Sequence, residues 1–115
     1  MTNITIYCSN NDYVGFRVSG HSGYSEAGYD IVCAGISALT INCMNSIEEL
    51  TEERFSVFQH EDDGVIDYML DDKPGMEAEI LLKSLVLGLR DLEKEYKDFI
   101  SVSYTHLTLP TTSRV

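Results

Sequence analysis

The chain has 115 residues, which suffices for one domain with its own hydrophobic core, and nineteen acidic residues against eight lysines and arginines give it a formal net charge of −11. An acidic surface repels the phosphate backbone of nucleic acids, which argues against direct binding of nucleic acid. It attracts basic proteins or peptides, and the alternative is that its acidity serves solubility alone. No apolar run approaches the roughly 20 residues of a membrane span, and three cysteines without a signal peptide indicate a soluble protein of the reducing cytoplasm.

Two strands are predicted at the start of the chain. Apolar and polar residues alternate over residues 4–7 and again over residues 13–19, as they do in strands with one buried face. The residues between these segments, Asn10, Asn11 and Asp12, are typical of a turn. The sequence therefore predicts a β-hairpin.

A histidine, a glycine-containing loop and a cysteine follow in quick succession. His21 comes at the end of the second predicted strand, and Cys33 falls in the first turns of an apolar helix expected over residues 31–50. A helix N-terminus stabilises a thiolate by roughly 0.3–1 kcal/mol and at most about 2 kcal/mol, which alone barely ionises a thiol at neutral pH. A nearby imidazole would complete the activation, so His21 and Cys33 are the candidate catalytic pair.

Three features around this pair each allow two interpretations. Asp30 stands where a helix N-cap is expected, and the alternative is that it orients His21. Ser37 lies one helical turn after Cys33 on the same face, where it either packs or contacts a substrate. The loop over residues 22–29 is either an ordinary turn or a lid that closes over the site.

The pattern G-H-x-G-Y, followed by G-x-D-I-V-C-A-x-x-S, resembles that of the bacterial ribosomal-processing cysteine proteases, and the resemblance extends over residues 1–102. The positions that match the family motif include Gly20, His21, Asp30, Cys33 and Ser37. The resemblance implies a dyad in which Cys33 is the nucleophile and His21 the base, with the other three residues contacting substrate or supporting the site. It also implies a homodimer. The implied substrate is the N-terminal extension of a large-subunit ribosomal protein, the twenty-seventh in the usual naming.

The second half of the chain predicts two strands, a helix and a last strand. Strands are expected over residues 54–59 and 65–70, joined by an Asp-Gly turn of the hairpin type. Apolar residues then recur at steps of three and four from residue 76 to about 97, which predicts an amphipathic helix. A short strand over residues 99–102 follows.

These elements predict an α+β fold. The order ββαββαβ is typical of a two-layer sandwich in which two helices cover one face of a mostly antiparallel sheet. The helix over residues 31–50 is apolar on more than one face, so either a partner subunit or the second helix is expected to cover it beside the sheet.

The domain is expected to span residues 1–102. Residues 103–115 contain no acidic residue and are rich in threonine, unlike the rest of the chain. This tail resembles translated adapter or vector sequence and is set apart from the fold, the alternative being a genuine and weakly structured extension.

The remaining candidates have simple interpretations. Cys8 and Cys43 are expected in the core, and His60 on the surface. The chain has no paired cysteine spacing of the kind that zinc sites use, so neither a metal nor a cofactor is expected.

The sequence thus predicts a cytoplasmic cysteine endopeptidase that acts on a ribosomal protein precursor with a basic N-terminal region. The first alternative is a non-catalytic module that docks on a basic ribosomal protein or assembly factor, with Cys33 as a buried helix residue. The second is a thiol redox protein, which the absence of a neighbouring resolving cysteine disfavours.

Overall fold

The computed structural model describes residues 1–20, 27–60 and 64–108, and of residues 27–29 it describes the backbone alone. Its elements follow the predicted order. They are β1 (Thr2–Ser9), β2 (Asp12–Gly20), α1 (Ala27–Leu50), β3 (Phe55–His60), β4 (Val65–Leu70), α2 (Met76–Glu95) and β5 (Ile100–His106).

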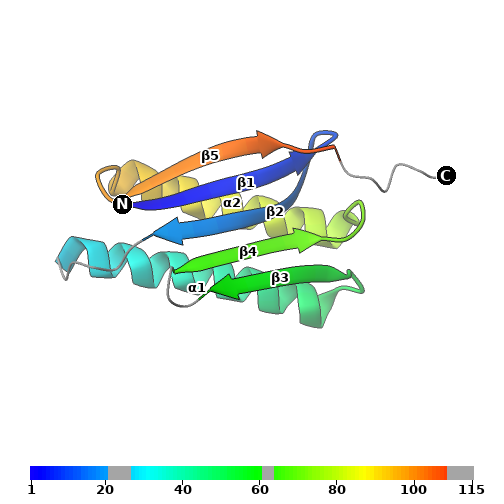
Figure 1. Ribbon diagram of the computed structural model, residues 1–115. Helices are drawn as coiled ribbons and strands as arrows, with labels where there is room; N and C mark the ends of the chain where they lie inside the picture. Colours follow the sequence, from blue (N-terminus) through cyan, green and yellow to red (C-terminus); the bar gives the residue numbers. More distant parts are fainter. Residues whose placement is uncertain (21–26, 61–63, 109–115) are drawn as a thin grey trace.

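The strands form one sheet in the order β3-β4-β2-β1-β5, antiparallel at every pairing except that of β1 with β5. Both helices lie on the same face of this sheet, α1 behind β3 and β4 and α2 behind the other strands (Figure 1). The predicted two-layer α+β sandwich is therefore confirmed.

The hairpin of β1 and β2 is also confirmed. Its turn residues Asn10 and Asn11 have φ values of 51° and 70°, in the left-handed region that asparagine tolerates and that tight hairpin turns require. The second hairpin, of β3 and β4, uses Gly64 with a φ of 64°. A glycine suits that position because it has no Cβ to clash.

The core lies between the sheet and the two helices. Its fully buried side chains include Ile4, Phe16, Val32, Ile47 and Leu89. Cys8 and Cys43 belong to it as expected.

The two helices approach each other closely at two glycines. A Cβ on Gly35 would lie 3.2 Å from a methyl carbon of Leu92, and one on Gly88 would lie 3.1 Å from a methyl carbon of Leu39. The large residue of each pair thus packs against a backbone that carries no side chain.

Most predicted boundaries lie within two residues of the observed ones, but two are wrong by four residues. α1 begins at Ala27, so Asp30 is not its N-cap but an acidic residue of its first turn. The same partial positive charge favours acidic residues at both positions, and local sequence does not tell them apart. β5 runs to His106 rather than to residue 102, because residues 103–106 continue the parallel pairing with β1.

Among the described helices, α1 reaches the length and composition of a membrane span over Asp30–Leu50, with a mean hydropathy of 1.3 in an 18-residue window. The expectation that no apolar segment reaches that length is therefore wrong. Core helices pass the same test, and α1 buries Val32, Ile36 and Ile47 in the domain's own core. Length and composition alone are weak evidence for a span.

Candidate active site

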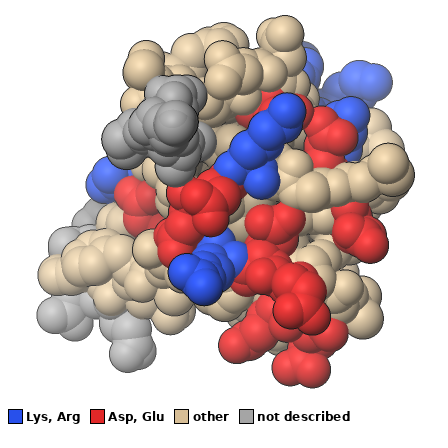
Figure 2. Space-filling view, turned by 90° about the vertical axis from the view of Figure 1, so that its right-hand side faces the viewer, with Lys and Arg blue, Asp and Glu red and all other residues tan. Residues whose placement is uncertain are grey.

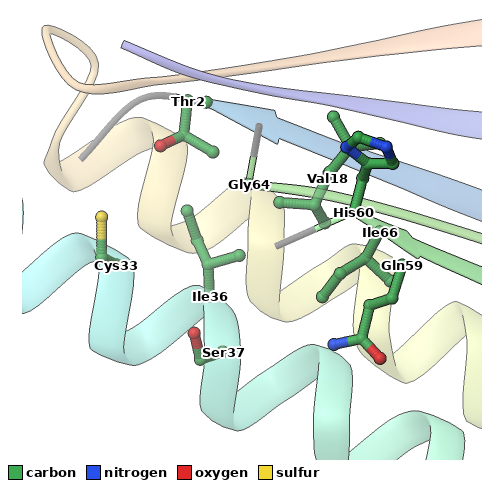
Figure 3. Close-up of a pocket in the computed structure, with 11 residues that line it drawn as sticks. Thr2, Val18, Cys33, Ile36, Ser37, Gln59, His60, Gly64 and Ile66 are labelled. Atoms are coloured by element: carbon green, nitrogen blue, oxygen red, sulfur yellow. The ribbon is translucent and has the colours of Figure 1, made fainter. Parts of the chain in front are cut away.

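A cavity of about 240 Å³ lies at the end of the molecule where β2 ends and α1 begins. Four strands and α1 contribute to its wall (Figure 3). It is lined by Thr2, Val18, Gly20, Cys33, Ile36, Ser37, Gln59, His60, Gly64, Val65 and Ile66. Three of the five motif residues, Gly20, Cys33 and Ser37, are thereby brought to one place.

Cys33 is the accessible thiol of the chain. It is half-buried, whereas Cys8 and Cys43 are only 5% and 4% exposed. Burial raises the pKa of both core thiols, that of Cys43 to about 11, so these two remain protonated at neutral pH. Any thiolate chemistry in the cavity therefore falls to Cys33.

The early start of α1 changes the electrostatics at this thiol. Cys33 is the seventh residue of the helix and stands in its second turn. The effect of the helix dipole falls off within the first turn. The helix dipole therefore stabilises a thiolate at Cys33 less than it would if the helix began at residue 31. An imidazole or another activating group must then contribute more of the activation of this thiol.

Gly20 forms one side of the cavity, where its backbone lies very close to the backbones of Thr2 and Gly64. A Cβ built on this residue would lie 2.9 Å from the Cα of Thr2, its partner across the sheet. The carbonyl oxygen of Gly20 would in turn lie 2.5 Å from a Cβ on Gly64. Glycine at position 20 therefore has a structural reason, the tight packing of three backbone segments beside the cavity.

Ser37 and Gln59 come from opposite sides of the cavity. Ser37 is exposed one turn after Cys33, and the amide of Gln59 extends from β3 toward α1 (Figure 3). Gln59 was not predicted as a site residue. The alternation along β3 could have indicated it. Gln59 lies on the same helix-facing side of β3 as Phe55 and Val57, and a polar residue on that side is unusual.

His60 is exposed, as predicted, but it also lines the cavity, which the sequence did not indicate. Its ring lies on the side of β3 that faces away from α1, opposite the side chain of Gln59 (Figure 3). There it stacks on Phe58, with ring centroids 5.6 Å apart.

The other motif residues are placed differently or not at all. Asp30 is exposed and is not among the described residues that line the cavity. His21 lies outside the described residues, and Gly20, which precedes it, is the last residue of β2. Of the predicted loop over residues 22–29, residues 27–29 are the first helical residues of α1, and residues 22–26 are also outside the described part.

No cluster of potential metal ligands is present among the residues that the structure describes.

Comparison with known proteins gives a consistent result. The family model described as "Cysteine protease Prp" matches residues 1–101. A ribosomal processing cysteine protease Prp of Staphylococcus aureus strain Mu50 is 33% identical over 87 residues, which are 76% of this chain and 82% of that protein.

Solved structures agree in fold. The S. aureus ribosomal processing protease in complex with a substrate peptide is 28% identical, with a TM-score of 0.85 over 91% of this chain and 100% of that one. The same protease with a covalently linked product peptide is 29% identical, with a TM-score of 0.82 over the same shares of the two chains.

Proposed function

Because the chain belongs to the cysteine protease Prp family, we propose that it is an endopeptidase that trims a ribosomal protein with Cys33 as its nucleophile. The observation that carries this proposal is the position of Cys33. It is the one accessible thiol among the three cysteines, and it lines a cavity together with Gly20 and Ser37, which match other positions of the family motif.

In the proposed reaction the Cys33 thiolate attacks the carbonyl carbon of the scissile peptide bond. His21 takes the thiol proton and returns it to the leaving amine, and water then hydrolyses the acyl-enzyme. The cavity supports this assignment because Gly20, the residue before His21, lines it together with Cys33. Asp30 and Ser37 are assigned supporting or substrate-contacting roles.

The proposed substrate is the N-terminal extension of the twenty-seventh protein of the large ribosomal subunit. The matched relatives are named ribosomal processing proteases, and the net charge of −11 favours a precursor with a basic N-terminal region. Acidic side chains are concentrated on the end of the molecule where α1 ends and α2 begins (Figure 2).

Assembly and location complete the proposal. The outer surfaces of the helices leave Ile31, Ile80 and Leu87 exposed, between 57% and 67%, which supports a homodimer that covers part of them. The three free cysteines support a reducing cytoplasm.

The test is incubation of the purified protein with the ribosomal protein precursor, followed by mass measurement of the products. We expect one cut that releases the N-terminal extension, and no cut with Cys33→Ala or Cys33→Ser. Cys8→Ala is the matched control, since it removes a thiol from the core and not from the cavity. An intact precursor that binds tightly to the wild-type protein would instead establish the non-catalytic docking module.

A further inference from the structure

β3 is an edge strand that leads into the cavity. It is the first strand in the order β3-β4-β2-β1-β5, so no strand lies beyond it in the part of the chain that the structure describes. Every residue from Ser56 to His60 is exposed. Its last two residues, Gln59 and His60, line the cavity that holds Cys33. An added strand on this edge would therefore run straight toward the thiol.

The hydrogen-bonding pattern shows which backbone groups face outward. The amide of Asp71 donates to the carbonyl oxygen of Arg54, so these residues form a hydrogen-bonded pair one step beyond the ladder of β3 and β4. Because such pairs alternate in an antiparallel ladder, the N–H and C=O groups of Phe55, Val57 and Gln59 point away from β4. These are the groups to which an extended chain can bind.

Beyond Gln59, the side of this edge that faces α1 is apolar. Val57 is 49% exposed, and its side chain lies on the same face of β3 as that of Gln59, the face toward the helices. On α1, Ile41 and Met44 follow Ser37 by four and seven residues, so they continue the strip of helix surface that begins at Cys33 and Ser37. Ile41 is 48% exposed and Met44 is partly exposed. Every second side chain of an added strand would meet this apolar strip.

The opposite end of β3 is acidic. The segments that meet there are the end of α1, the start of β3, the end of β4 and the start of α2 (Figures 1 and 2). They carry Glu48, Glu49, Glu52, Glu53, Asp71, Asp72 and Glu77, against Arg54 and Lys73. Six residues of strand span about 20 Å, so this acidic end lies about one strand length from the cavity.

We propose that the substrate binds as an additional strand along the edge of β3, with alternate apolar side chains against α1, its scissile bond in the Cys33 cavity and a basic segment at the acidic end. The inference rests on the proposed function, because it takes the cavity as the place of cleavage. It adds a requirement on the substrate: about six residues on one side of the scissile bond must be extended, with apolar side chains at every second position.

Binding is best measured without cleavage, by titrating Cys33→Ala with a synthetic peptide of the precursor N-terminal region. The peptide amides are methylated one at a time. In an added edge strand only every second N–H points to β3, so the dissociation constant should rise about fivefold at alternate positions and stay within twofold between them. A loss that does not alternate, or an absence of binding, would overturn the docking mode.

A protein variant tests the same contact from the other side. Val57→Pro removes an outward N–H that β4 does not use, and proline is tolerated at such edge positions. We expect about fivefold weaker peptide binding with an unchanged rate of Cys33 alkylation by iodoacetamide in the corresponding Cys33-containing variant. The control is Val57→Ala, which shortens the same side chain but keeps the N–H, so its loss of binding should be smaller than that of Val57→Pro. Equal binding by Val57→Pro and Val57→Ala would contradict the proposal.

The acidic end has its own test. Glu49→Gln combined with Glu52→Gln should weaken binding about threefold at low salt and have no effect at high salt, because exposed ion pairs are weak and screened. Glu95→Gln, at the far end of α2, is the control.

Cleavage by the wild-type protein separates the docking proposal from the proposed function. Alternating losses in binding without any cleavage would refute the protease assignment alone. Cleavage without alternating losses would refute the docking mode alone.

Discussion

Gly20 and Thr2 pair across β2 and β1 so closely that a Cβ on Gly20 would lie 2.9 Å from the Cα of Thr2 and 2.8 Å from its Oγ1. Both residues line the cavity that holds Cys33, and His21 follows Gly20 in the chain. The spacing of two backbone segments thus defines one wall of the proposed active site.

Gly20→Ala is therefore expected to displace the end of β2. Backbone atoms cannot yield as a flexible side chain can, so the free energy of unfolding should fall by about 1–3 kcal/mol and kcat/KM should fall with it. Urea unfolding and a cleavage assay measure the two effects. Ser19→Ala is the neighbouring control and should be nearly neutral. Wild-type stability in Gly20→Ala would show that this close approach is relaxed in solution.

The three thiols should react with iodoacetamide in a fixed order. Cys33 is half-buried, while Cys8 and Cys43 are buried in the core and have raised pKa values. Cys33 should therefore be alkylated first at pH 7.5, with Cys43 at least about a hundredfold slower, as peptide mass mapping over time would show. Equal rates in the folded protein would remove the basis for assigning Cys33 as the nucleophile.

Substitution distinguishes His21, the proposed base, from His60, which lines the cavity. His21→Ala should lower kcat/KM by about 10²–10⁴ and should slow the alkylation of Cys33. His60→Ala should change kcat/KM only a few-fold, because the ring of His60 lies on the side of β3 away from α1 (Figure 3). The reverse result would make His60 the base.

Tyr68→Phe should preserve or increase stability. The hydroxyl of Tyr68 is buried without a hydrogen-bond partner among the described residues, while its ring stacks on Phe16 and packs against Phe55 at centroid distances of 5.2 and 5.1 Å. Phenylalanine keeps these ring contacts and removes a desolvated polar group, which favours a gain of about 1 kcal/mol in urea unfolding. A loss of that size would reveal a buried water bound to the hydroxyl.

Stability should decline in alkaline solution, in part through Cys43. Burial raises the pKa of this thiol from 9.0 to about 11, so the unfolded chain gives up the proton at a lower pH than the folded one. Its contribution to the free energy of unfolding is complete below pH 9 and is lost as the pH rises to 11. Unfolding curves at several pH values under reducing conditions should show a shallower decline for Cys43→Ala. An unchanged slope would mean that Cys43 ionises equally in both states.

Local sequence determined most of the secondary structure. Alternation placed β4 at residues 65–70 and helical periodicity placed the start of α2 at residue 76, because burial of one face imposes a period of two on strands and of 3.6 on helices. The end of β5 was missed because it depends on pairing with β1, and the start of α1 was missed because an acidic residue suits both the N-cap and the first turn. Residues 103–106 have an unusual composition, yet they pair with β1 in the sheet.

The sequence by itself predicted cysteine-protease chemistry, because His21 and Cys33 lie within one short motif that resembles that of a known family. Only the tertiary structure added Gln59 and His60 to the same cavity, and only it made β3 an edge that leads to Cys33. The physical reason is the strand order. β3 reaches the end of β2 through its pairing with β4, and pairings between residues so distant in sequence depend on the packing of the whole sheet.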